Sequence, residues 1–359
     1  MVLTKQLTSD AEKNVAERPT LERISKDGCI GRRAMELYNM FYKHGPGNGA
    51  MLSLPFDQLV EHGIGHILSW ENSGNPEAVI ELAGSGKFSA LAFSIGQAEK
   101  YKRLVKECGV PLIVKVDGHF LVGDEVVYPR HSEMASVKRA VDAGANAIGL
   151  TFYLGGEETQ QDVERVSRII EEAHKSEKPV FMWAYARGPL VDKMGADSLY
   201  WCSQGVSAGE SLGADVVKQK FPMPLSNKKI SEYKMNLERK GYLGSKMPDA
   251  EKLLELEPKN SEETPSELHV KRLSFMARCA PRTQVIVSGG PKSENEEGLL
   301  KTLRIIMDSG LEGQIMGRNL WARPIEEALA LNARMISIMQ DEKYSRKLSA
   351  EFVGKYARK

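Results

Sequence analysis

Short runs of consecutive apolar residues recur along the chain, and longer amphipathic stretches separate most of them. A run that is apolar at nearly every position predicts a strand covered on both faces, as in a parallel sheet. Eight such runs are present: Met51–Asp57, Phe88–Phe93, Pro111–Val116, Ala147–Phe152, Pro179–Tyr185, Ala214–Lys220, Gln284–Ser288 and Gly313–Met316.

Between the strand candidates, three stretches carry a clear helical pattern: Gln97–Glu107, Glu133–Val141 and Gln160–His174. Two phrases, DAGANAIGL and SLGADVVK, place Gly144 and Gly213 between a helical pattern and a buried strand. Glycine at this position predicts a left-handed helix cap.

Eight strands that alternate with helices predict an α/β protein with a (β/α)8 TIM barrel, which needs about 250 residues. The chain has 359 residues, so we expect additional segments. We assign residues 1–50 to an N-terminal extension that packs on the barrel and residues 51–359 to the barrel itself. A charged, mostly helical insertion is expected at about 222–281, between strands six and seven. A lid, a subunit contact and a solvated helical excursion are all open interpretations of it.

Composition narrows the class of protein. Lys and Arg total 49 against 48 Asp and Glu, so the net charge of +1 argues against a nucleic-acid binder. No apolar run approaches the roughly 18 residues of a membrane-spanning helix, and the polar N-terminus does not resemble a secretory signal. Four widely spaced cysteines indicate a reducing compartment. We therefore expect a cytoplasmic protein with no nucleic-acid or membrane partner.

Reactive groups of a (β/α)8 barrel lie at the carboxyl ends of its strands. The sixth run, GADVVKQKFP, places Lys218 and Lys220 on one side of a short apolar strand. A lysine near a second cation in a low-dielectric site loses proton affinity, and its neutral amine attacks carbonyl carbons. A salt bridge to Asp117 or Glu61, or a phosphate contact, is the alternative.

Three other strand ends carry polar groups. Asp57 follows the first run and predicts either a rim carboxylate or a helix N-cap. Lys115 interrupts the third run two residues before Asp117, which indicates either a functional lysine or a buried Lys–Asp pair. Trp183 and Tyr185 share a face of the fifth run, where the tyrosine could transfer a proton or both rings could simply pack.

Glycine-rich turns follow the seventh and eighth runs. The two sequences are VSGGPK, with Ser288, Gly289 and Gly290, and MGRNLW, with Gly317 and Arg318. Bare backbone amides at the ends of two consecutive strands, together with an arginine fork, predict a phosphate site.

A zinc site is a competing interpretation of the segment HGIGH. His62 and His66 have the spacing of two ligands on one helix face, but two glycines weaken such a helix. His119 is the third histidine that lies near a strand end.

Six motifs occur in the order LPFDQLVEHG, LIVKVDGH, FMWAYARG, LGADVVKQKF, VSGGPK and MGRNLW. With these motifs the chain resembles the class I fructose-1,6-bisphosphate aldolases of archaeal and bacterial type, over about residues 50 to 340. That family belongs to the Schiff-base aldolase superfamily, which includes deoxyribose-phosphate aldolase. The resemblance implies a carbon–carbon lyase that cleaves fructose 1,6-bisphosphate reversibly to dihydroxyacetone phosphate and glyceraldehyde 3-phosphate in glycolysis and gluconeogenesis.

The same resemblance implies roles for individual residues. Lys218 would form the Schiff base, Tyr185 would transfer protons, and Asp57 would be the acidic residue. The implied substrate-binding residues are Lys115, Trp183, Arg187, Ser288, Gly289, Gly290, Gly317 and Arg318. No metal or other cofactor is implied, because the iminium itself polarises the substrate.

The implied partners are a sugar phosphate and further copies of the chain, since the family forms homo-oligomers, decamers among them. One alternative is a related Schiff-base aldolase, transaldolase or thiolase that acts on another phosphorylated sugar or ketone. A non-catalytic barrel that binds sugar phosphates, and a metal-dependent aldolase that uses His62 and His66, are the others.

Overall fold

The computed structural model describes residues 2–26, 30–58, 61, 75–119, 131–156, 158–188, 191, 195–226, 230–231, 253, 255–258 and 264–357. In this part of the chain, no helix is both long and apolar enough to cross a membrane.

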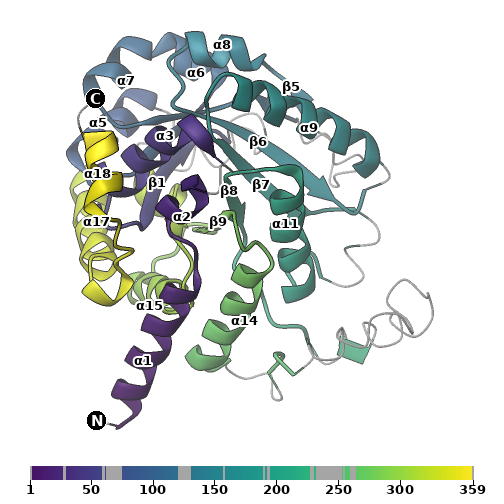
Figure 1. The fold of residues 1–359 in the computed structure, drawn as a ribbon, viewed down its shortest axis with the longest axis vertical. Helices are drawn as coiled ribbons and strands as arrows, with labels where there is room; N and C mark the ends of the chain where they lie inside the picture. The colour runs from purple at the N-terminus through teal and green to yellow at the C-terminus, as the bar shows by residue number, and fades with distance from the viewer. Residues whose placement is uncertain are drawn as a thin grey trace.

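Eight parallel strands form a closed barrel in the order β1, β10, β9, β8, β7, β6, β3 and β2 (Figure 1). Their bounds are β1 Met51–Phe56, β2 Ala90–Ser94, β3 Leu112–Lys115, β6 Ala147–Leu154, β7 Val180–Ala186, β8 Val216–Gln219, β9 Gln284–Ser288 and β10 Gly313–Ile315. Each strand overlaps one of the eight predicted runs, so the (β/α)8 TIM barrel is confirmed.

Helices surround the strands on the outside (Figure 1). Those that follow β1 are α5 Pro76–Ser85, α6 Ile95–Lys100, α7 Lys102–Cys108, α8 Val137–Asp142, α9 Thr159–Lys175, α11 Leu199–Leu212, α14 Ser266–Arg278, α15 Glu296–Asp308, α16 Arg318–Trp321, α17 Ile325–Met339 and α18 Ala350–Ala357, with the 3-10 turn η3 Glu342–Tyr344. Gly144 and Gly213 have φ angles of +106° and +93°, so both predicted left-handed turns are confirmed.

The helix predicted at Glu133–Val141 begins later than expected. Ser132–Glu133 instead forms β5, which pairs antiparallel with β4 at Asp117–Gly118. The helix α8 begins after Ser136, because the Ser136 hydroxyl accepts a hydrogen bond from the backbone N–H of Arg139. The helix therefore begins at the serine cap, three residues or more after the start that the apolar periodicity predicted.

The N-terminal extension closes the amino-terminal end of the barrel. It comprises α1 Val2–Glu17, α2 Leu21–Lys26, the 3-10 turn η1 Gly31–Arg33, α3 Ala34–Tyr38 and the π-helical turn η2 Asn39–Lys43. Apolar side chains of this extension, such as Leu37 and Phe41, form one buried cluster with inward-facing barrel residues, such as Phe181 and Ile286. The tyrosine Tyr38 also contacts the α18 aromatics Phe352 and Tyr356, so α3 of the extension packs against the C-terminal helix.

Buried ion pairs hold the extension against the strands. Arg33 pairs with Asp215, just before β8, at 3.0 Å. Arg18 pairs through Nε with Glu312, just before β10, at 3.2 Å, and Arg346 pairs with the same carboxylate. Burial raises the pKa of Glu312, but the two guanidiniums outweigh it and hold that pKa below the ordinary value.

The segment predicted as an insertion, at about 222–281, ends in a helix of the barrel layer. This helix, α14, packs against α11 and α15 and buries Leu273 and Met276. Arg272 of α14 forms a buried ion pair of 2.7 Å with Glu257. Most of 227–263 lies outside the described residues.

Replacing Glu312 by glutamine tests the buried charge cluster. We expect Glu312→Gln to lower the free energy of unfolding at pH 7 by about 3 kcal/mol, because two buried arginines would lose their shared carboxylate. The folded-state pKa lies below the ordinary 4.5, so this contribution is present above pH 4.5 and disappears as the pH falls through the folded pKa.

Urea unfolding at pH 7 measures the difference, with the exposed Glu326→Gln as the matched control, expected within about 0.5 kcal/mol of the parent. Equal stability of the two variants would contradict the prediction.

Candidate active site

Lys218 lies on β8 beside Trp183 of β7, since these two residues are register partners. Its Nζ is 4.9 Å from the centroid of the Trp183 ring and 5.9 Å from that of Tyr185. No ion pair joins Lys218 to the residues that the structure describes, whereas most buried lysines have a carboxylate partner. The amine is therefore held over aromatic rings.

The surroundings of Lys218 favour its neutral form. Burial lowers the pKa of Lys218 to about 8; the carboxylate of Asp57 opposes this shift, and the cation of Lys115 adds to it. At neutral pH, about one amine in ten is then unprotonated, compared with far fewer than one in a thousand for a free lysine.

Lys115 ends β3 and remains charged although its side chain is only 1% exposed. Its Nζ contacts a carboxylate oxygen of Glu61 and lies 4.0 Å from Asp57 Oδ2. Burial lowers the pKa of Lys115, but these two carboxylates outweigh burial and raise it. Asp117, the sequence-predicted partner, instead forms a 2.7 Å ion pair with Arg165.

Asp57 lies directly after β1, as the sequence predicts, and is 6% exposed. Burial raises the pKa of Asp57, while the charges of Lys115 and Lys218 limit this rise. A carboxyl group in this position can exchange a proton more readily near neutral pH than an exposed aspartate.

Tyr185 lies opposite Tyr153 in the register of β6 and β7, with ring centroids 6.4 Å apart. The Arg187 guanidinium carbon lies 5.7 Å from the Tyr153 centroid and 5.8 Å from the Tyr185 centroid. Burial raises the pKa of Tyr185 well above its ordinary value. Tyr185 is therefore a neutral phenol, able to donate a proton and to regain it.

The two lysines of VVKQK differ in their surroundings. Lys220 Nζ forms a 2.7 Å ion pair with Asp197 Oδ1. The alternative of a salt bridge therefore applies to Lys220, with a partner that the sequence did not indicate. Of these two lysines, Lys218 is the one without a carboxylate partner in the described part of the chain.

Two histidines join the site: His119, near the end of the third predicted strand, and His131, which no predicted strand end indicated. His131 is 1% exposed, and its Nε2 lies 3.0 Å from Nδ1 of His119. Its Nδ1 lies 3.7 Å from Glu61, and its ring stands edge-on to that of Tyr153. The ligand atoms of Glu61 and the two histidines lie within 4.8 Å of one another. This donor set could bind a divalent cation, but the Lys115 ammonium already contacts one carboxylate oxygen of Glu61.

The glycine turns after β9 and β10 are adjacent. Ser288 ends β9, and the N–H of Gly289 donates to the carbonyl of Ile315 on β10 at 2.9 Å. Gly290 has a φ angle of +70°, which favours glycine. At Gly317, an added Cβ would lie 2.8 Å from Nε1 of Trp321, so no larger residue fits without a shift.

Asn319, which follows Gly317 and Arg318 in the second glycine-rich turn, joins the two turns. Its buried amide Nδ2 donates to the carbonyls of Gly289 at 2.9 Å and Pro291 at 2.8 Å, and Oδ1 accepts from the N–H of Ser293 at 2.7 Å. Asn319 follows Arg318, which is half-buried and opens the short helix α16. The position of Asn319 inside MGRNLW was the only sequence signal for it.

His62 and His66, the candidate zinc ligands, lie outside the described residues. The other predicted residues converge on the carboxyl-terminal end of the barrel, because each lies on or directly after a parallel strand. There the site combines an amine with no carboxylate partner among the described residues, the neutral phenols of Tyr153 and Tyr185, carboxylates close to Lys115, and two glycine turns.

A (β/α)8 barrel with a lysine of lowered pKa at the carboxyl end of β8 has the site of an enzyme that forms a Schiff base with its substrate. The sequence matches the DeoC/LacD family aldolases over residues 51–323. The chain belongs to this family.

Known proteins of the family are similar along most of the chain. A fructose-bisphosphate aldolase class 1 from Thermoproteus tenax is 29% identical, covering 77% of this chain and 84% of the relative. A fructose-bisphosphate aldolase/6-deoxy-5-ketofructose 1-phosphate synthase from Methanocaldococcus jannaschii is 26% identical, covering 73% of this chain and 71% of the relative.

Among solved structures, an archaeal fructose-1,6-bisphosphate aldolase superposes with a TM-score of 0.63 at 26% identity, covering 84% of this chain and 99% of that one. Its catalytic lysine is covalently bound to the carbinolamine intermediate of the substrate.

Removing the charge of Lys115 should raise the pKa of Lys218. Lys115→Met removes a neighbouring cation and leaves the carboxylates of Glu61 and Asp57 to stabilise the protonated amine. Labelling of Lys218 by pyridoxal phosphate and borohydride, quantified by mass spectrometry from pH 6 to 10, should be half-maximal near pH 8 in the parent and at higher pH in the variant.

Lys220→Met is the matched control, because Lys220 pairs with Asp197, and it should leave the midpoint unchanged. A midpoint that stays the same in Lys115→Met would show that this cation does not set the pKa of Lys218.

Proposed function

We propose that this protein is a class I aldolase that cleaves fructose 1,6-bisphosphate reversibly into dihydroxyacetone phosphate and glyceraldehyde 3-phosphate. The observation that carries the proposal is the environment of Lys218: a half-buried amine over two aromatic rings, with a pKa of about 8 and no carboxylate partner among the described residues. The names of the family relatives, which are fructose-bisphosphate aldolases, support the choice of substrate.

In the first step, the neutral Lys218 amine attacks the C2 carbonyl of the open-chain sugar and forms a carbinolamine. Loss of water, assisted by protonation of the departing hydroxyl, leaves a positively charged iminium. Asp57 and Tyr185 are the proton-transferring groups that lie near Lys218.

Cleavage follows because the iminium accepts electrons. A base removes the proton of the C4 hydroxyl, the C3–C4 bond breaks, and its electron pair moves toward the iminium to give an enamine. Glyceraldehyde 3-phosphate leaves as the aldehyde. Tyr185 then protonates C3 of the enamine and recovers its proton from the base that took the C4 proton. Water hydrolyses the restored iminium, which releases dihydroxyacetone phosphate and free Lys218.

Phosphate binding positions the reacting carbons. The amides of Gly290 and Gly317 and the guanidinium of Arg318 would hold one phosphate, while Gly289, whose own N–H donates to Ile315, would shape the turn beside Ser288. Lys115 and Arg187 add positive charge toward the rest of the substrate, and Trp183 supports the amine. Remote binding energy of this kind orients the bond that breaks.

The scheme requires no metal, because the iminium supplies the electron sink. A cytoplasmic homo-oligomer, with a decamer as one form, remains our prediction for the assembly and its location.

A related Schiff-base aldolase reaction is the second candidate. The Methanocaldococcus jannaschii relative carries two activities in its name, fructose-bisphosphate aldolase and 6-deoxy-5-ketofructose 1-phosphate synthase. A change of substrate would keep Lys218 and Tyr185 and alter the groups around them. Parallel cleavage assays with fructose 1,6-bisphosphate and fructose 1-phosphate distinguish an enzyme that needs both phosphates from one that needs only the first.

Borohydride trapping tests the role of Lys218. With fructose 1,6-bisphosphate present, reduction should inactivate the enzyme and add one substrate-derived adduct, which peptide mass spectrometry should locate on Lys218. Lys218→Ala should abolish both the adduct and cleavage, whereas Lys220→Ala is the matched control and should still form the adduct. Full activity after reduction, or complete loss of activity with EDTA, would refute the scheme.

Tyr185→Phe should separate Schiff-base formation from cleavage of the carbon–carbon bond. The variant should still form the borohydride-trapped adduct, but kcat for cleavage should fall by about 10²–10⁴, because the phenolic proton donor is lost. Stopped-assay cleavage rates and adduct yields measure the two steps. Tyr101→Phe, between α6 and α7, is the control; a Tyr185→Phe variant with parental kcat would remove the tyrosine from the mechanism.

A further inference from the structure

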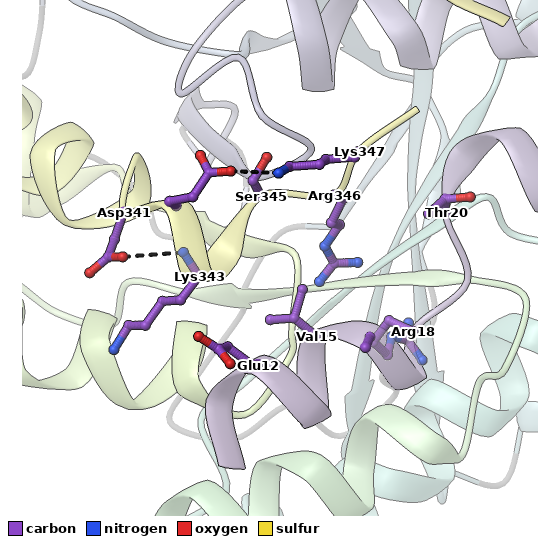
Figure 2. Close-up of a pocket in the computed structure, with 11 residues that line it drawn as sticks. Glu12, Val15, Arg18, Thr20, Asp341, Lys343, Ser345, Arg346 and Lys347 are labelled. Carbon is purple, nitrogen blue, oxygen red and sulfur yellow. Dashed lines mark hydrogen bonds and ion pairs between the residues drawn. The ribbon is translucent and has the colours of Figure 1, made fainter. Parts of the chain in front are cut away.

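A hollow on the protein surface lies at the opposite end of the barrel from Lys218. It has a volume of about 610 Å³ and is bounded by the C-terminal half of α1 and the segment 341–347 (Figure 2). Arg18 and Arg346 line it together with apolar Val15 and polar Ser345. The volume lies in the range of small-molecule sites.

Arg346 has hydrogen-bond capacity that the protein does not use. The residue is 5% exposed, and its Nη1 and Nη2 donate to Glu312 and to the carbonyl of Gly310. A guanidinium carries five N–H groups, so three have no partner among the described residues. Because Arg346 lines the hollow, these N–H groups can donate to a ligand with several acceptor oxygens.

Arg18 and Arg346 also place positive charge in the lining of the hollow. Both guanidiniums share the single carboxylate of Glu312, so the buried cluster carries one net positive charge. The N–H groups of Arg18 donate to Glu312 and to the carbonyls of Ala277, Ala280 and Thr283. Arg346 is therefore the arginine of this pair that has N–H groups without a partner among the described residues.

The rim carries charges of both signs, but water screens them. Lys347 pairs with Glu342 at 2.8 Å, with side chains 79% and 78% exposed, so the pair is weak and Lys347 can turn toward an anion. Asp341 is exposed and its carboxylate accepts from the N–H of Lys343 as the cap of η3. Glu12 lies on the α1 side of the rim (Figure 2).

We propose that this hollow binds a phosphate group, either free phosphate or that of a small phosphorylated metabolite. The unused N–H groups of Arg346 are its main donors, and Lys347 closes over it from the rim. The bound anion would contact both α1 and the segment after α17. Binding would then stabilise the closed end of the barrel by linkage.

Thermal unfolding in increasing inorganic phosphate, at constant ionic strength set by chloride, tests the proposal on the full-length protein. The proposed active-site phosphate turn provides an internal reference, because Arg318→Ala weakens only that site. We expect Arg318→Ala to keep a phosphate-dependent rise in Tm. Lys347→Ala added to that background should weaken the remaining phosphate affinity about threefold to tenfold.

Arg346→Lys keeps the charge beside Glu312 but removes the fork, so it should weaken the same affinity about tenfold or more. Lys175→Ala is the matched control for Lys347→Ala, because Lys175 is 72% exposed and paired with Glu171, and it should have no effect. Glycerol phosphate as a second probe distinguishes the sources: stronger binding than inorganic phosphate identifies a phosphorylated metabolite as the ligand.

The proposal is overturned if Arg318→Ala alone abolishes the phosphate effect, since all phosphate binding would then belong to the carboxyl-terminal site. It is also overturned if Arg346→Lys and Lys347→Ala bind phosphate like the Lys175→Ala control. Either result leaves the aldolase reaction untouched, because that reaction is tested at Lys218.

Discussion

Two lysines share the carboxyl-terminal end of the barrel, and the division of charge between them underlies everything else in the site. The carboxylates of Glu61 and Asp57 lie close to Lys115, so Lys115 keeps its proton. Lys218 lies over Trp183 with no such partner in the described region, and the cation of Lys115 makes a second charge there unfavourable. Burial, with the cation of Lys115 adding to it, thus favours the neutral amine at Lys218, and the two carboxylates keep Lys115 protonated.

The sequence predicted the barrel because buried parallel strands leave an unambiguous record, namely short runs that are apolar at nearly every position. It also predicted which polar residues gather at one end of the barrel, because a polar residue at the end of such a run has to lie at the carboxyl end. Lys115, Lys218 and Tyr185 interrupt or end apolar strands, and packing alone gives no reason for their presence there.

Pairings between distant segments could not be read from the sequence in the same way. Lys218 and Lys220 have equal rank in VVKQK, and only the structure shows that Asp197 neutralises the second of them. Asp117 looked like the partner of Lys115, but Arg165 of α9 takes it. His131 and Asn319 act through contacts with other loops, and no local periodicity marks them.

The cluster of Arg18, Glu312 and Arg346 has a consequence for how the chain is made. Arg18 is synthesised 294 positions before the carboxylate that it contacts, and Arg346 follows that carboxylate by 34. On the ribosome, Arg18 has no carboxylate partner of this kind until Glu312 has emerged, 294 positions later. The buried charge cluster at the amino-terminal end of the barrel can therefore form only after all eight strand segments have been synthesised.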